Sequence, residues 1–296
     1  MIGLKRGTVT LCAYDPLWAS VGQDYCARIK AALGKYAIEV AHVGSTAVPG
    51  LCAKPIIDVA VGVQSFDTQI IARMEKAGFL HRTSHDDDHN MLFVDGQGEV
   101  RFAHIHVVVY NGMEWRNYVN FVSFLRAFDH VSQAYAALKQ ALASKYPNDR
   151  EAYTASKAQF ISYTLRKAMV WSYLGKQIDA VVDRPVGYLH VKGSKRLHYP
   201  INYGYVPGVL GGDGEELDVY YLGVSEPLER FSGRVIAIAH RADDVEDKLV
   251  ACPVHLDFNA RDICNQILFQ EKYYDTTIQT HDGQLLHISN GEEHGN

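Results

Sequence analysis

The first half of the chain alternates between helix-like and strand-like spacing of its hydrophobic positions. Apolar residues at helical intervals predict a helix over Asp15–Gly34, and a short apolar run predicts a strand over Ile38–Val43. Pro55–Val63 is apolar almost throughout, which indicates a buried strand. The same spacing predicts a helix over Gln69–Gly78, a strand over Arg101–Tyr110, and helices over Phe121–Phe128, Gln133–Tyr146 and Glu151–Leu174. This order of elements indicates an α+β architecture.

Near Gly175–Asp179 the pattern changes from long helices to short strands broken by Gly, Pro and Asp. Val181–Pro253 is typical of an all-β region with closely spaced turns, and Asn259–Tyr274 has the spacing of a helix that packs on it. We therefore predict a first domain at 1–175, a small barrel with a C-terminal helix at 176–279, and a polar tail at 280–296. For the tail we expect mobility and no function.

Composition excludes several classes of protein. The 296 residues carry a formal net charge of −5 and contain no apolar run of the ~20 residues that span a bilayer. Five scattered cysteines without a Cys-x-x-Cys pair fit reduced thiols. We therefore expect a cytoplasmic protein that does not insert into membranes, disfavour nucleic acid as a partner, and leave a homo-oligomer open.

Four carboxylates stand within six residues in Asp213-Gly214-Glu215-Glu216-Leu217-Asp218, on a turn that leads into a predicted strand. Hard cations such as Mg²⁺ bind through carboxylate and phosphate oxygens, so this cluster favours metal-phosphate chemistry. A solvated acidic turn would explain the same residues. A second charged group offers another metal ligand in Glu246 and a phosphate-binding cation in Lys248.

Three linked motifs extend this pattern: Tyr199-Pro200-x-Asn202-Tyr203-Gly204-Tyr205, then Asp213-Gly214-x-x-Leu217-Asp218, then Lys248-Leu249-Val250-Ala251-x-Pro253. In order and spacing they resemble family I inorganic pyrophosphatases, over about Ile178–Asp275. The resemblance implies an OB-like barrel and several Mg²⁺ ions, with Mn²⁺ as the alternative, that activate a water molecule against pyrophosphate.

The resemblance also implies roles for individual residues. The metal ligands would be Asp213, Glu215, Asp218 and Glu246. Catalytic roles would fall to Asp218, Lys248 and Tyr203, and phosphate contacts to Lys192, Arg196 and Tyr273. The chain departs from the family at Glu215, at Tyr274, and at Arg241, where a metal-binding aspartate is expected. Asp243 or Asp244 would supply the missing carboxylate after a small loop shift, and Lys195 or Arg196 the phosphate-binding arginine.

A Gly-Ser turn in the first half, at Gly44-Ser45, lies between two predicted strands, where backbone amides and a hydroxyl would face phosphates. An ordinary loop connection would explain the turn alone. The longer string from His42 to Asp58 resembles the GrpB family, whose fold is similar to the nucleotidyltransferases, over about Tyr14–Lys167. The resemblance implies a nucleotidyltransferase-like mixed sheet, substrate contacts from Gly44, Ser45, Lys54 and His106, and a metal at Asp58.

Two further positions bear on the chemistry of this first domain. Ala60 stands where nucleotidyltransferases carry a second carboxylate. His104 and His106 are spaced to share one face of a strand, where they would bind a metal, act as acid-base groups, or serve as hydrogen-bonded structural residues.

Together the two resemblances imply a Mg²⁺-dependent hydrolase of pyrophosphate or a related phosphoanhydride, coupled to a nucleotide-binding or nucleotidyltransferase-like domain. If both sites are active the enzyme is bifunctional, because the tethered hydrolase would remove the pyrophosphate that nucleotidyl transfer releases. The alternative is a noncatalytic nucleotide-binding or sequestering protein with two phosphate pockets. Both hypotheses predict that the protein binds a small-molecule phosphoanhydride or nucleotide.

Overall fold

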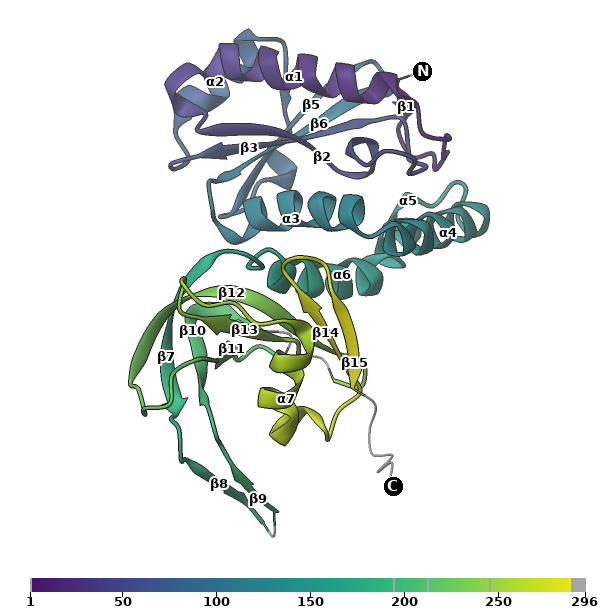
Figure 1. Ribbon diagram of the computed structural model, residues 1–296. Helices are drawn as coiled ribbons and strands as arrows, with labels where there is room; N and C mark the ends of the chain where they lie inside the picture. The colour runs from purple at the N-terminus through teal and green to yellow at the C-terminus, as the bar shows by residue number, and fades with distance from the viewer. Residues whose placement is uncertain (1, 194, 212, 245, 289–296) are drawn as a thin grey trace. The chain divides into compact units, whose positions relative to one another are not determined.

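The computed structural model describes residues 2–193, 195–211, 213–244 and 246–288 of the chain (Figure 1). The chain divides into two compact units, Met1–Ala168 and Met169–Asn296. The boundary falls inside helix α6, Ala158–Trp171. Each unit has its own hydrophobic core.

The first unit is built on a six-stranded mixed sheet with the order β2-β3-β6-β5-β4 and with β1 paired to β6. Its strands are β1 (Leu4–Lys5), β2 (Glu39–Val43), β3 (Ile57–Val63), β4 (Leu80–His81), β5 (Asn90–Gln97) and β6 (Val100–Val109). Its α-helices are α1 (Leu17–Leu33), α2 (Thr68–Lys76), α3 (Met113–Ala127), α4 (Asp129–Lys145), α5 (Arg150–Ala155) and most of α6. Short 3₁₀ turns cover Gly34–Tyr36, Ser45–Ala47 and Thr83–His85.

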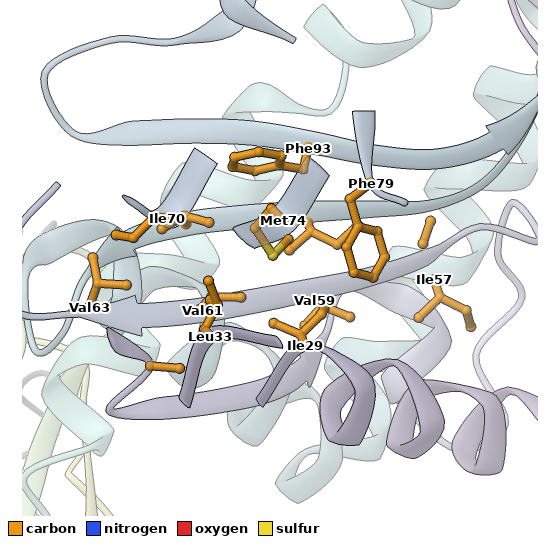
Figure 2. Close-up of a cluster of buried hydrophobic side chains, with 14 of the residues drawn as sticks. Ile29, Leu33, Ile57, Val59, Val61, Val63, Ile70, Met74, Phe79 and Phe93 are labelled. Carbon is orange, nitrogen blue, oxygen red and sulfur yellow. The ribbon is translucent and has the colours of Figure 1, made fainter. Parts of the chain in front are cut away.

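The two faces of this sheet have different surroundings. Val59, Val61 and Val63 of β3 alternate onto the face covered by α1 and α2, where they pack with Ile29 and Met74 (Figure 2). The opposite face packs against α3, α4 and α6 through a second cluster. Because Asp58 lies between two core-facing residues of β3, its side chain belongs to the second face.

The sequence predictions for this unit hold for most of the longer elements, but the short strands β1 and β4 were not predicted. The single helix expected over Glu151–Leu174 is two helices, because a tight turn at Ser156–Lys157 closes α5 before α6 begins. Strand β5 was not predicted, since its apolar residues Met91, Leu92 and Phe93 are consecutive and follow a run of aspartates typical of a loop.

The second unit contains a closed five-stranded barrel. Its sheet follows the order β13-β11-β10-β7-β12-β14-β15, and an additional pairing of β12 with β13 closes the first five strands. The bounds are β7 (Gln177–Arg184), β8 (Leu189–Lys192), β9 (Lys195–His198), β10 (Asn202–Leu210), β11 (Glu216–Tyr221), β12 (Arg230–Arg241), β13 (Lys248–Cys252), α7 (Ala260–Glu271), β14 (Thr276–Thr280) and β15 (Leu285–Ile288). The predicted small barrel with a C-terminal helix is confirmed.

The polar tail expected from residue 280 is corrected in part. Thr280 ends β14, and Leu285–Ile288 form β15, which pairs antiparallel with β14. The apolar residues Leu286 and Ile288 pack on the barrel core, and this explains why the segment is ordered into a strand despite its polar neighbours. Residues 289–296 of the expected tail lie outside the described residues. No helix in the described ranges has the length and hydrophobicity needed to cross a bilayer.

Candidate functional sites

Three neighbouring barrel strands bring Tyr203, Asp218 and Lys248 together. Asp218 precedes Val219 on β11, and Lys248 precedes Leu249 on the parallel strand β13, in register with it. The Lys248 ammonium donates to Asp218 Oδ2 at 2.5 Å, and the Tyr203 hydroxyl donates to the same oxygen at 2.5 Å. Tyr203 is fully buried and Lys248 is 2% exposed, so this carboxylate is held from the inside of the barrel.

Glu246 adds a second carboxylate to this group. Its Oε2 accepts from Lys248 Nζ at 2.7 Å, so the lysine ammonium bridges Glu246 and Asp218. Burial raises the pKa of Glu246 to about 7, and the charges of Asp218 and Asp213 raise it against the opposing effect of Lys248. We call Tyr203, Asp213, Asp218, Glu246 and Lys248 the acidic cluster. Burial is the largest cause of the shift in the pKa of Glu246, and Lys248 opposes it more strongly than Asp218 adds to it.

The donor atoms of the acidic cluster fit a hard divalent cation. They are carboxylate oxygens, and a second cation beside Lys248 would favour the ionised form of Glu246, whose pKa burial raises. Asp213, Asp218 and Glu246 are the residues that would hold it. In the described part of the chain no three His, Cys, Asp or Glu side chains already surround one metal position. The ammonium group of Lys248 lies between the carboxylates of Asp218 and Glu246.

Arg184 was not singled out from the sequence, yet it lies against the acidic cluster. Its guanidinium donates to the Tyr199 hydroxyl at 2.8 Å and stands 4.9 Å from the ring centroid of Tyr203. Burial raises the pKa of the neighbouring Asp183, and the charge of Asp218 adds to the shift although Arg184 opposes it. The sequence feature that could have identified Arg184 is its position directly before Pro185, at the end of the first strand of the barrel.

The structure shows no contact of the other four predicted side chains with the acidic cluster within the described ranges, and the side chain of Lys192 is not among those described. Glu215 is exposed, and its backbone amide donates to Asp213 Oδ1 at 3.0 Å. Tyr273 is 59% exposed beyond the end of α7. Arg196 is exposed on β9, in a two-stranded sheet separate from the barrel, and makes no side-chain hydrogen bond within the described ranges. The backbone of Lys192 belongs to β8, while its side chain lies outside what the structure describes.

Arg241 is buried in the second unit, where it pairs with a buried carboxylate and not with a metal site. It is 2% exposed and forms a bidentate pair with the fully buried Glu271, with contacts of 3.0 and 2.6 Å. Its Nη1 also donates to Asp244 Oδ2 at 3.1 Å, and the ring of Tyr274 lies 3.6 Å from its guanidinium. Asp243 accepts from the amide of Asp275. The expected loop shift therefore does not occur, because Asp243 and Asp244 have other partners.

In the first unit, the Gly-Ser turn lines a pocket of about 260 Å³. The pocket is lined by four residues that the sequence named as candidates, Gly44, Ser45, Lys54 and Asp58, and by three cations that it did not single out as site residues: Lys139, Arg150 and Lys157. We call this the lysine pocket. Lys139 is 2% exposed, and its ammonium donates to Ser45 Oγ at 3.1 Å and to the carbonyl of Cys52.

The cationic side chains of the lysine pocket lie close to one another. Burial, together with repulsion by Lys54, lowers the pKa of Lys139 and of Lys157 to about 8 each. Burial and the charge of Arg150 also lower the pKa of Lys54. These cations therefore lie close enough to repel one another, and an anion bound among them would be stabilised.

His104 and His106 share the second face of the sheet, as predicted. In the parallel register His104 lies opposite Asp58, and His106 lies opposite Ala60. His104 Nδ1 is 3.3 Å from Asp58 Oδ1; although burial raises the pKa of Asp58, this contact and its charge hold the value below the ordinary range. Burial lowers the pKa of His106 to about 4, so its ring is neutral near pH 7.

Gly44 gives a stability prediction for the turn. Its φ is +72°, and a Cβ there would lie 2.5 Å from Asp58 Oδ2. We expect Gly44→Ala to lower the free energy of unfolding of the first unit by about 1–3 kcal/mol. Gly50→Ala is the matched control, because Gly50 has φ +77° with nothing within 4 Å of its Cβ position, and should lose only the backbone part. Equal losses in urea unfolding of the two variants would contradict this account of Gly44.

Comparison with known families divides the chain in the same order as the motifs. The family described as GrpB protein matches residues 8–167, and the family described as inorganic pyrophosphatase matches residues 175–279. A glutamate-rich protein GrpB from Alkalihalophilus pseudofirmus is 33% identical over 173 residues, which cover 56% of this chain and 99% of that protein. A UPF0157 protein from Deinococcus radiodurans is 33% identical over 53% of this chain and 81% of its own length.

Two solved structures are similar to parts of this chain. A GrpB protein from Enterococcus faecalis is 26% identical, covers 54% of this chain and 96% of its own, and superposes with a TM-score of 0.49. An inorganic pyrophosphatase from Ehrlichia chaffeensis is 17% identical, covers 39% of this chain and 88% of its own, and gives a TM-score of 0.29. The two family matches confirm both resemblances stated from the motifs.

Proposed function

This chain belongs to the GrpB family and carries an inorganic pyrophosphatase domain after the GrpB region, and from that premise we propose that its second unit hydrolyses pyrophosphate or a related phosphoanhydride with the help of Mg²⁺. The observation that carries the proposal is the acidic cluster. It places a carboxylate held by Tyr203 and Lys248 beside a second carboxylate, Glu246, at the ends of neighbouring strands.

In the proposed reaction the oxygen of a water molecule bonds to one phosphorus of pyrophosphate, and Asp218 receives a proton of that water. The bond from this phosphorus to the bridging oxygen breaks, and the bridging oxygen leaves on the second phosphate, which yields two phosphates. The two hydrogen bonds to Asp218 Oδ2 fix the orientation of this carboxylate. Lys248 would exchange its contacts with Asp218 and Glu246 for phosphate oxygens as substrate enters. Arg184 supplies a further cation beside the Tyr203 ring.

Asp213, Asp218 and Glu246 would hold the metal, which supplies charge neutralisation at the phosphate and an acidified water when bound. Coupling to the first unit forms the remaining part of the proposal. The lysine pocket would bind a nucleotide or another phosphate ligand, and the tethered hydrolase would remove pyrophosphate where it is released.

Metal removal tests the dependence on Mg²⁺. We expect phosphate release from pyrophosphate by the full chain to fall to background in excess chelator, because no divalent cation would then offset the charge of substrate and cluster. Restoring Mg²⁺, or Mn²⁺ as the alternative ion, should recover it. A malachite-green assay of released phosphate measures this, and release that persists in chelator would contradict the metal requirement.

A noncatalytic binding protein is the second candidate, and one observation favours it. Lys248 forms ion pairs with both Asp218 and Glu246, which lowers the net negative charge available to a metal. This candidate expects no phosphate release from pyrophosphate or from a panel of nucleotides at any Mg²⁺ concentration, together with measurable binding of the same compounds by calorimetry. Turnover of any of them would exclude it.

A further inference from the structure

A second pocket adjoins the lysine pocket in the first unit. It also has a volume of about 260 Å³ and is lined by Arg6, Arg82, Arg101 and Arg150 with His104 and His106. We call this the arginine pocket. His104 and Arg150 line both pockets, so the two are adjoining parts of one cleft on the side of the sheet that carries Asp58.

The cleft holds seven cationic side chains and one carboxylate. That carboxylate, Asp58, is directed to His104 at 3.3 Å. Within the described ranges none of the seven cations forms an ion pair with an Asp or Glu side chain. In a chain with net charge −5, a concentration of unpaired cations is costly unless an anion binds there.

Several of these cations are positioned by the fold rather than left in solvent. Lys139 is held by Ser45 and by the Cys52 carbonyl, and Arg101 is 9% exposed with hydrogen bonds to the carbonyls of Gly98 and Val100. Burial lowers the pKa of Arg101, and Arg6 and Arg82 add repulsion to the effect. His106 also lines the arginine pocket, and its buried Nδ1 has no hydrogen-bond partner among the described residues. The site is therefore built into the fold and incomplete without a ligand.

The two pockets offer different chemistry. Lysine ammonium groups act as point charges, and with the Ser45 hydroxyl they suit the oxygens of a phosphate. Arginine guanidinium groups bind carboxylate or phosphate in a bidentate manner. Leu92 and Val94 of β5 give the arginine pocket an apolar wall, on which the uncharged part of a ligand can pack. One cleft with two cationic ends separated by the Asp58–His104 pair fits a ligand whose anionic groups are also separated.

We propose that this cleft binds a small molecule with phosphate groups at two separate positions, one in the lysine pocket and one in the arginine pocket. The proposal deepens the nucleotide-binding role proposed for the first unit and rests on it, but it does not depend on hydrolysis in the second unit. The ligand is distinguished from a nucleoside diphosphate by the placement of its phosphates, not by their number.

Calorimetric titration of the full chain in chelator, with three nucleotides as probes, tests the proposal. Adenosine 3′,5′-bisphosphate and ADP carry the same number of phosphates, separated in the first and adjacent in the second, and AMP carries one. We expect the bisphosphate to bind about 10-fold more tightly than ADP or AMP, because one additional charge-assisted contact contributes about 1.5 kcal/mol.

Two substitutions assign the pockets. Lys157→Gln in the lysine pocket should weaken all three nucleotides about 10-fold, whereas Arg82→Gln in the arginine pocket should weaken the bisphosphate about 10-fold and leave AMP within about 2-fold. Both side chains are only partly buried, and circular dichroism verifies that the variants are folded. The control is Lys76→Gln, an exposed lysine at the end of α2, whose helix packs on the opposite face of the sheet.

The outcomes separate this proposal from the hydrolase. ADP binding as tightly as the bisphosphate, or an Arg82→Gln variant that binds the bisphosphate like the parent, would overturn the two-position ligand. Phosphate release from pyrophosphate, measured on the same variants with Mg²⁺, should stay within about 2-fold of the parent because both substitutions lie in the first unit. If the parent protein itself released no phosphate from pyrophosphate, that result would contradict the proposed hydrolase and not the proposed ligand of the cleft.

Discussion

Asp218→Asn should lower the rate of phosphate release from pyrophosphate by about 10²–10⁴-fold, the usual contribution of a positioned general base. The substitution keeps the size of the side chain and a hydrogen-bond acceptor for Tyr203, but it removes the charge that pairs with Lys248 and accepts the proton of water. The measurement is kcat from released phosphate at saturating Mg²⁺ and substrate.

The matched control is Asp179→Asn. Asp179 is an exposed aspartate on β7 of the same barrel, and it forms no ion pair in the described ranges, so its loss should leave kcat within about 2-fold. A parent protein that releases phosphate while Asp218→Asn keeps most of that rate would exclude Asp218 from the reaction. Release by neither protein would favour the noncatalytic alternative.

Arg241→Leu should destabilise the second unit by about 3–5 kcal/mol, because it leaves the fully buried carboxylate of Glu271 without its cation. A loss of this size would move the midpoint of urea unfolding by about 1 M or more. Arg241→Asp, which restores the residue that the pyrophosphatase motif predicts, should be worse than Arg241→Leu, since it adds a second negative charge beside Glu271.

Arg234→Leu is the comparison for this prediction. Arg234 lies on the same strand, β12, and pairs at 3.6 Å with Asp257, which is 56% exposed, so the loss of this ion pair should cost less than about 1 kcal/mol. Arg234 also forms hydrogen bonds with His281 and the Leu256 carbonyl, and the substitution leaves no charge buried alone. The double variant Arg241→Leu with Glu271→Leu should recover part of the loss, because neither charge is then left buried alone. Similar midpoints for Arg241→Leu and Arg234→Leu would show that the buried pair is not the source of stability.

Much of the fold could be predicted because local patterns and tertiary environment agree. The β-branched run of β3 is buried on both faces, and the apolar spacing of α1 matches the face it packs on the sheet. In the barrel, the motif residues Asp218 and Lys248 are 30 positions apart in the chain, yet their strands are adjacent and parallel. The motifs identified this pair because their order and spacing match those of a known family with the same strand topology.

The remaining site residues depend on packing that no local pattern encodes. Lys139 lies on α4, where a lysine among alanines predicts an ordinary solvated position, and Arg150 begins the short helix α5. Only the docking of these helices on the sheet brings their charges beside Ser45 and Lys54. The same limit explains Arg241, whose position in the motif suggested a metal ligand, while the burial of Glu271 decides its actual partner.

Glu271 is the last residue of α7, and it accepts hydrogen bonds from Tyr220 on β11, Arg241 on β12 and Thr276 on β14. The hydrogen bonds of one carboxylate thus connect the end of a helix to three strands. Opening of this helix end would require all these bonds to break together, so its backbone amides should exchange with deuterium as slowly as those of the barrel strands. The pathway of unfolding would then release α7 only when the barrel itself opens.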